Sequence, residues 1–230
     1  MKLSELLSAN EYPGRGIALG LTPDGKRSAA VYFIMGRSVN SRNRVFVEEP
    51  DGIRTEAYDP SKLEDPSLII YHPVREVGRG LIVTNGDQTD TILEYLERGL
   101  PMEQALRTRE FEPDDPNWTP RISGLLSPDG SYKLSILRAA DAEGSACRRN
   151  FFEYPGQAGV GHFIHTYETN GNPLPTFSGE PRPVEIGSDI DAFAEEIWNS
   201  LNAENKISLF VRFTDLATGK TEQRIFNKNQ

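Results

Sequence analysis

A block of arginines and short polar side chains is the part of this sequence best suited to chemistry. Apolar runs at 31–34 and 45–47 enclose it, and between them stand Arg37, Arg42 and Arg44, interleaved with Ser38, Asn40, Ser41 and Asn43. Planar guanidinium groups beside amides and hydroxyls suit two-pronged binding of a phosphate or a carboxylate. A polar hairpin loop that holds no ligand is the alternative. The block favours a small anionic ligand.

A second candidate is the sequence Asn-Gly-Asp-Gln-Thr-Asp at 85–90, between a predicted strand and a predicted helix. The first amides of a helix have no partner within it and point at whatever lies there. Asn85 or Asp87 could equally serve as a helix cap. The sequence leaves both interpretations open.

Two further places could supply an acid or a base. Residues 111–121 combine three carboxylates with a tryptophan and Arg121 in a segment stiffened by prolines, although a loop with capping side chains explains them equally well. Tyr71 ends an apolar run, where a strand end could open onto a site. A buried, hydrogen-bonded tyrosine is the commoner explanation for such a residue.

Composition excludes several classes of protein. The chain has 230 residues and a net charge of −9, which argues against a nucleic-acid binder and against an anionic membrane surface as partner. The single cysteine, Cys147, excludes an intramolecular disulfide and fits a reducing cytoplasm. His162 and His165 lack the cysteines or acids that would complete a zinc site, so no metal is expected. With no signal peptide or membrane-spanning stretch, a cytoplasmic protein is expected.

Turn signals and periodicity predict the elements that position these residues. Hairpins around turns at 22–25, 128–130 and 217–219 pair 16–21 with 29–35, 122–126 with 132–137, and 208–213 with 221–226. Short strands are expected at 68–71 and 81–84. Apolar spacing predicts helices over 4–9, 87–98, 102–109 and 190–201, the last capped by Ser188.

About ten strands with three or four widely separated helices favour antiparallel sheets covered by helices, an α+β fold. The segment 170–183, rich in Gly, Pro and Asn, is the expected long loop. With no linker in between, residues 1–230 are expected to form one domain.

Taken in order, several motifs resemble the archaeal IMP cyclohydrolase family. They are Tyr-Pro-Gly-Arg-Gly at 12–16, Gly-Arg-Ser with Asn-Arg at 36–44, Ile-Ile-Tyr at 69–71, Val-Thr-Asn-Gly-Asp-Gln-Thr-Asp at 83–90 and Thr-Pro-Arg-Ile at 119–122. The chain departs from the family by two extra residues within 39–42 and by Asp87-Gln88 in place of Thr-His. Beyond residue 122 the similarity is one of length and strand pattern.

The resemblance implies a four-layer αββα sandwich of two antiparallel sheets between helices, similar to the N-terminal-nucleophile hydrolases. It also implies a cyclohydrolase that closes 5-formamidoimidazole-4-carboxamide ribotide to IMP with loss of water, without a cofactor. A homo-oligomer is compatible with it. The alternatives are a non-catalytic purine-nucleotide-binding protein and a related enzyme that processes the amide of another ribotide.

The resemblance also assigns roles to individual residues. Tyr71 and Arg44 would stabilise and protonate the formyl oxygen, and Glu112 would orient or deprotonate the attacking amide. The ribotide would be bound by the remaining site residues, with the phosphate on the arginine block and the ribose or carboxamide beyond it: Arg37, Ser38, Arg42, Asn43, Asn85, Thr89 and Arg121.

Overall fold

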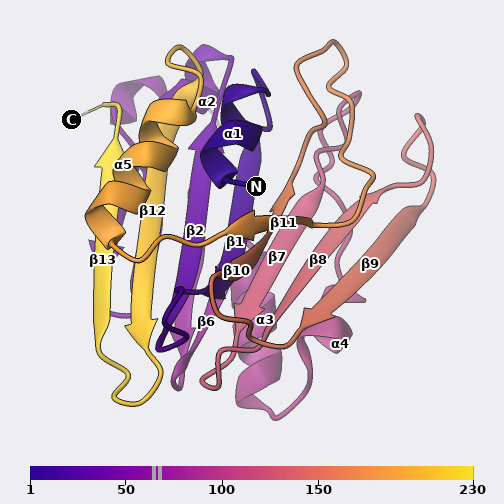
Figure 1. Cartoon of the computed structure of the whole chain (residues 1–230). Coiled ribbons are helices and arrows are strands. Elements are labelled where there is room, and N and C mark those ends of the chain that lie inside the picture. The colour runs from indigo at the N-terminus through magenta and orange to yellow at the C-terminus, as the bar shows by residue number, and fades with distance from the viewer. Residues whose placement is uncertain (64–65, 67–68, 230) are drawn as a thin grey trace.

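The computed structural model describes residues 1–63, 66 and 69–229, and two antiparallel sheets dominate it (Figure 1). The first sheet has the order β11-β10-β1-β2-β12-β13 and the second β3-β4-β5-β6-β7-β8-β9. The strands of the first sheet are β1 (Arg15–Leu21), β2 (Arg27–Met35), β10 (Val160–His165), β11 (Arg182–Glu185), β12 (Lys206–Asp215) and β13 (Thr221–Asn227). Those of the second are β3 (Arg44–Glu49), β4 (Gly52–Ala57), β5 (Val74–Val77), β6 (Gly80–Thr84), β7 (Arg121–Leu126), β8 (Tyr132–Ala139) and β9 (Cys147–Tyr154).

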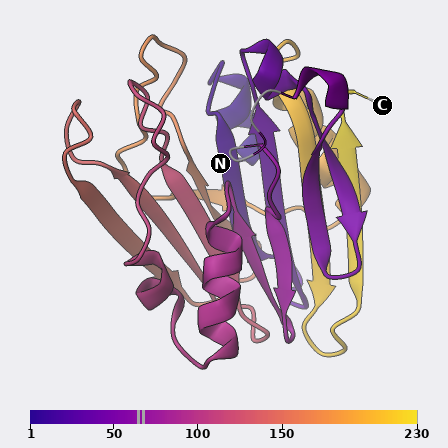
Figure 2. The same ribbon diagram turned by 180° about the vertical axis from the view of Figure 1, so that it is seen from behind.

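The helices lie on the outer faces of the sheets (Figures 1 and 2). Apolar side chains of α1 (Leu3–Ser8) and α5 (Ile190–Ser200) share a core with the first sheet. Those of α3 (Gln88–Glu97) and α4 (Met102–Leu106) share a core with the second. Two short helices, α2 (Val39–Arg42) and a 3-10 turn at Pro60–Lys62, complete the described helical elements.

A third core fills the space between the two sheets, and strand alternation creates it. On β1 and β2, Ile17 and Tyr32 point inward to this core, whereas Ala18 and Phe33 point outward to the helices. Both sets are apolar because these central strands are covered on both faces. Tyr32 is therefore buried in the core between the sheets.

Most of the predicted elements are confirmed. The three predicted hairpins are β1–β2, β7–β8 and β12–β13. The four predicted helices are present, and their bounds differ from the predicted ones by at most three residues. The cap of α5 is Asp189 rather than Ser188, because the Asp189 carboxylate accepts the amide of Ala192 at 2.9 Å. The long loop lies between β10 and β11, as expected.

The prediction of a strand over 68–71 is wrong for residues 69–71, and Leu68 lies outside the described residues. The amides of Ile69 and Ile70 both donate to the carbonyl of Pro66, which makes a turn. Tyr71 instead joins Thr55 of β4, whose amide donates to the Tyr71 carbonyl at 2.9 Å. This contact fixes Tyr71 beside the second sheet without making it part of a strand.

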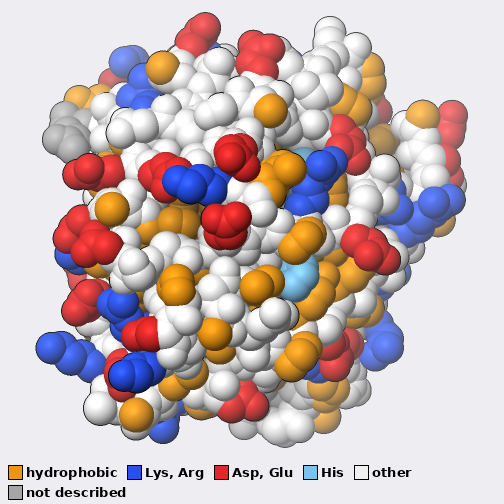
Figure 3. Space-filling model, in the orientation of Figure 1, with side chains coloured by type: hydrophobic (Ala, Val, Ile, Leu, Met, Phe, Trp, Pro, Cys, Tyr) orange, Lys and Arg blue, Asp and Glu red, His pale blue; other side chains and the backbone are white. Residues whose placement is uncertain are grey.

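The surface carries charges of both signs. In Figure 3, acidic and basic side chains are interspersed over the face that bears α1 and α5, with apolar side chains between them. Such mixing differs from the one-signed basic face of most nucleic-acid binders. Among the described residues, no helix is both long enough and apolar enough to span a bilayer.

Candidate active site

Three arginines begin three strands at one end of the sandwich. Arg15 is the first residue of β1, Arg44 of β3 and Arg121 of β7. β1 is antiparallel to β2, and β7 is antiparallel to β6. The first residues of β1 and β7 therefore lie beside the last residues of β2 and β6. In Figure 1 this is the upper end, beside α2. Positive charge is therefore concentrated where the strand ends meet.

Arg15 and Glu112 form a buried but loose ion pair. The guanidinium Nη2 lies 4.0 Å from the carboxylate Oε2, and the two side chains are 12% and 5% exposed. The Nε of Arg15 is buried without a hydrogen-bond partner among the described residues. A buried donor without a partner is costly, so an acceptor atom of a ligand or of a water would be stabilising here.

Arg44 lies near this pair and is almost fully buried, at 1% exposure. Its Nε donates to the carbonyl of Ser41 at 2.9 Å, which aims the guanidinium inward from the start of β3. Burial, and then the nearby charge of Arg15, lower the pKa of Arg44. Two guanidinium groups therefore share one buried region.

Two tyrosines complete the group. The hydroxyls of Tyr32 and Tyr71 lie 2.9 Å apart, and both side chains are buried. Burial, followed by the proximity of Tyr71, raises the pKa of Tyr32 well above its ordinary value. Tyr32 thus stays protonated, and its hydroxyl can donate a hydrogen bond to the hydroxyl oxygen of Tyr71.

The positive charge of the group is not fully neutralised by its one acid. Burial raises the pKa of Glu112, although the charges of Arg15 and Arg121 oppose this. Burial also lowers the pKa of Arg15, but Glu112 and the phenol of Tyr167 outweigh burial and hold it above its ordinary value. Two buried cations with one carboxylate leave excess positive charge, which suits an anionic or strongly polar ligand.

Three predicted site residues lie together, and their side chains form hydrogen bonds with neighbouring residues of the chain: Asn85, Thr89 and Arg121. The Asn85 amide donates to the Pro120 carbonyl at 2.8 Å and accepts from the Ile122 amide at 2.8 Å. The Thr89 hydroxyl lies 2.6 Å from that of Thr84. The Asn85 bonds tie the turn before α3 to β7, and the Thr89 bond ties the first turn of α3 to the end of β6.

Arg121 is held by the same turn. Its Nη1 lies 2.8 Å from the Asp87 carboxylate and 2.8 Å from the amide oxygen of Gln88. Asp87 also pairs with Arg109. Burial raises the pKa of Asp87, but the bond from Arg109 and the charge of Arg121 outweigh it and leave this pKa lowered. Asp87 is therefore an ionised anchor for Arg121.

The arginine block divides into separate roles. Arg37 is exposed and donates to the Asn170 side chain and the Gly171 carbonyl, both at 2.7 Å. Ser38 caps α2 by accepting the amide of Ser41.

Two more residues of the block, Arg42 and Asn43, join distant parts of the chain. Arg42 donates to Glu204 at 3.1 Å and to Asn205 at 3.0 Å. Asn43 exchanges two hydrogen bonds with the backbone of Asp59. Their place in a ligand site stays a prediction, because each already has a structural partner.

The sequence pointed to Arg44, Tyr71 and Glu112, which the fold brings together, but not to Arg15 or Tyr32. Arg15 stands within the Tyr-Pro-Gly-Arg-Gly motif, and a charged residue just before an apolar run was the available signal. Tyr32 lies in a continuous apolar run, so only the antiparallel register with β1 shows which face it occupies.

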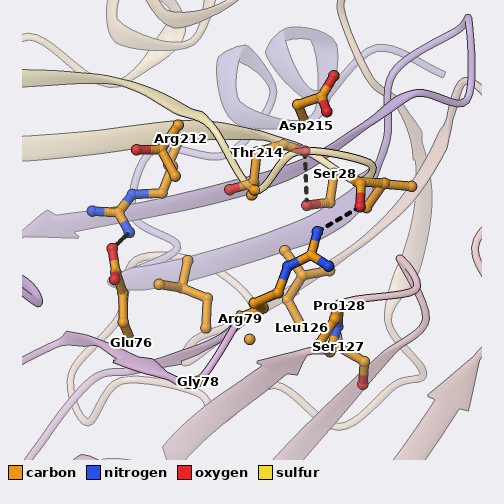
Figure 4. A pocket seen from close by; sticks show the side chains of 15 residues that line it. Ser28, Glu76, Gly78, Arg79, Leu126, Ser127, Pro128, Arg212, Thr214 and Asp215 are labelled. Carbon is orange, nitrogen blue, oxygen red and sulfur yellow. Dashed lines mark hydrogen bonds and ion pairs between the residues drawn. The ribbon is translucent and has the colours of Figure 1, made fainter.

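A separate pocket lies at the opposite end of the sandwich, where Figure 4 shows Arg79, Arg212, Glu76 and Asp215 around it. Arg212 donates to Glu76 and to Gln223, and Arg79 donates to the Leu216 carbonyl at 2.7 Å. Because both arginines are paired, this pocket is a weaker candidate than the group around Arg15.

Comparison with known proteins places these features in a family. A family model described as IMP cyclohydrolase-like protein matches residues 12–220. The chain is 34% identical over 132 residues to an IMP cyclohydrolase of Halobacterium salinarum, which covers 56% of this chain and 63% of that protein. It is 33% identical over 147 residues to one of Methanopyrus kandleri, covering 58% of this chain and 72% of that protein. A Methanococcus maripaludis relative of the same name is 35% identical over 128 residues, with coverages of 53% and 61%.

Proposed function

Since the chain belongs to the IMP cyclohydrolase-like family, we propose that it is a cyclohydrolase that closes 5-formamidoimidazole-4-carboxamide ribotide to IMP with loss of water. The matched region spans less than two thirds of the Halobacterium relative, so the activity rests on the site as well as on the family. The observation that carries the proposal is the buried group of Arg15, Arg44, Tyr71 and Glu112, which has two cations, one acid and a phenol.

The reaction forms one C–N bond and breaks one C–O bond. The carboxamide nitrogen attacks the formyl carbon and releases one proton, and the formamido nitrogen releases a second as its bond to that carbon becomes double. The formyl oxygen gains charge, takes up two protons and leaves as water. Holding the two groups in contact removes much of the barrier, because the attack is intramolecular. The protein must therefore position the substrate, stabilise the oxygen and move protons.

In this proposal Tyr71 and Arg44 stabilise and protonate the formyl oxygen. Tyr32 supports them, because its protonated hydroxyl lies 2.9 Å from that of Tyr71 and fixes its orientation. Glu112 accepts the proton that the amide loses. Its raised pKa suits that role, since a base works best when its pKa lies near the operating pH.

Arg15 joins the site in two ways. Its unpartnered Nε supplies a donor for a polar group of the ribotide. Its ion pair with Glu112 keeps that carboxylate ionised enough to act as a base. This residue extends the set inferred from the sequence.

The ribotide phosphate is assigned to Arg37, with Ser38, Arg42 and Asn43 shaping the loop around it. Arg37 is exposed, and its guanidinium lies 5.2 Å from the ring centre of Tyr12, so the charge stands at the surface beside the buried group. Asn85, Thr89 and Arg121 are assigned to the side of the site that receives the ribose or the carboxamide.

We further propose that the sheets and helices form the four-layer αββα arrangement of the N-terminal-nucleophile hydrolases, within one domain over 1–230. The outer positions of α1 and α5 on one sheet, and of α3 and α4 on the other, support this layering.

Purified protein with the formamido ribotide tests the proposal, since ultraviolet absorbance follows closure of the purine ring. We expect turnover, together with a rise in melting temperature on adding IMP, because a ligand that binds the folded state stabilises it by mass action. Stabilisation by IMP without turnover would instead indicate a nucleotide-binding protein. The absence of both turnover and stabilisation would refute the proposal.

A further inference from the structure

Each sheet has two edge strands, and at one side of the sandwich the edges protect each other. Asn227 of β13 donates to the Phe46 carbonyl at 3.0 Å and accepts the Phe46 amide of β3 at 2.8 Å. Gln223 of β13 also donates to Glu48 of β3. These side chains cover the backbone edge of β3 at Phe46 and join β3 to β13.

The third edge, β11, is short and partly covered. It spans four residues and includes Pro183, which has no amide hydrogen to donate. The Glu185 amide donates to the Met1 carbonyl at 3.0 Å, and the backbones of Lys2 and Glu185 form an isolated parallel β-bridge. The remaining edge, β9, is eight residues long and is outermost in its sheet (Figures 1 and 2).

The β8–β9 hairpin shows which backbone groups of β9 face outward. The Ala140 amide donates to the Ala146 carbonyl at 2.9 Å, and hydrogen-bonded pairs alternate along an antiparallel ladder. Arg148, Asn150, Phe152 and Tyr154 therefore bond to β8. The amides and carbonyls of the intervening residues point away from the sheet: Cys147, Arg149, Phe151 and Glu153.

We propose that β9 pairs with β9 of a second copy of this chain, antiparallel about a two-fold axis at Phe151. This register sets Arg149 opposite Glu153 of the partner subunit, and by symmetry Glu153 opposite Arg149 of the partner subunit. Both residues point to the face that carries α4: Arg149 donates to the carbonyls of Leu106 and Arg109, and Lys133 donates to Glu103 and to Glu153.

Charge selects this register. Shifting the two-fold axis to residue 149 would oppose Arg149 to Arg149 of the partner subunit, and shifting it to residue 153 would oppose two glutamates. Like charges directly opposite each other destabilise a sheet, whereas opposite charges and aromatic pairs stabilise it. The axis at Phe151 sets opposite charges at both cross-strand positions and an aromatic pair between them, which is the self-complementarity a two-fold interface requires.

Sedimentation of the whole protein over a concentration series tests the pairing. We expect a reversible dimer for the wild type. Glu153→Arg and Arg149→Glu should each weaken dimerisation about ten-fold or more, because each places like charges at both cross-strand positions. An equimolar mixture of the two variants should restore the dimer, since every facing pair is then Arg with Glu. A wild type that stays monomeric, or single variants that dimerise normally, would overturn the proposal.

Hydrogen exchange provides a measurement that needs no variant. Amides of Arg149, Phe151 and Glu153 should exchange slowly when the protein is concentrated and faster when it is dilute, whereas Asn150 and Phe152, bonded to β8, should change little. Equal exchange of the outward amides at both concentrations would contradict pairing through β9.

Discussion

Replacing Tyr71 with phenylalanine keeps the ring and deletes the hydroxyl that we assign to the formyl oxygen. The structure sets the cost in stability. The Tyr71 hydroxyl lies 2.9 Å from that of Tyr32, whose side chain is fully buried. Tyr71→Phe leaves the Tyr32 hydroxyl without this partner, which should lower the free energy of unfolding by ~1–3 kcal/mol.

Tyr32→Phe is the matched control, because it removes the same hydrogen bond and leaves the Tyr71 hydroxyl in place. Its stability should fall by a similar amount, and the double variant should be more stable than the sum of the two losses implies, since no hydroxyl is left unpaired. Urea denaturation of the four proteins measures this cycle.

Turnover separates the roles of the two tyrosines. Tyr71→Phe should lower kcat by roughly 10²-fold or more, the usual effect of losing a donor to developing charge. Tyr32→Phe should lower it much less, since Tyr32 only orients Tyr71. Measuring kcat for both at a substrate concentration that saturates each protein gives the comparison. A folded Tyr71→Phe protein with wild-type kcat would refute the mechanism, and equal losses in both variants would refute the division of roles.

Four further predictions concern the charged residues. Arg44→Lys should lower kcat/KM by about 10²-fold or more, because an ammonium lacks the two-pronged fork, and near-normal kinetics would remove Arg44 from the reacting centre. Arg37→Ala should raise KM with little change in kcat, and should shrink the rise in melting temperature caused by IMP; equal shifts in variant and wild type would contradict the phosphate assignment. Arg15→Gln removes the counter-charge of Glu112, so the acid limb of the pH–rate profile should move to higher pH, and an unmoved limb would argue against the ion pair. Burial raises the pKa of Glu112 above its ordinary value of 4.5, so the folded state keeps a proton that the unfolded chain has released, and stability should fall as the pH rises above that value. Urea denaturation over a pH series measures this dependence of the free energy of unfolding on pH. Glu112→Gln should make it weaker, and an unchanged slope would contradict its assignment to Glu112.

Local turn chemistry made much of the fold predictable. Each predicted hairpin carries a turn with Gly after Asp or Thr, and Gly25, Gly130 and Gly219 adopt the positive φ that such turns need. The two amphipathic helices on which the periodicity was clearest, α3 and α5, pack their apolar faces as expected. These features depend on neighbours in sequence, which is why a single sequence shows them.

The unpredicted elements depend on distant contacts. β9 mixes charged and aromatic residues because one of its sides is an open edge, so its alternation was hard to recognise. The turn at Ile69 and Ile70 looked like a strand because its residues are apolar, whereas Pro66 accepts both amides. In the site, the sequence located the charged residues, but only the register of β1 and β2 brings Arg15 and Tyr32 to the same end as Tyr71.

The initial rate of IMP formation from the formamido ribotide tests the central claim most directly. Purified wild-type protein should raise the rate of ring closure in proportion to enzyme concentration, and Tyr71→Phe at the same concentration should remove most of that increase. If the wild-type rate equals the rate without protein, while IMP still raises the melting temperature, the chain binds the nucleotide without catalysing its formation and the account is wrong.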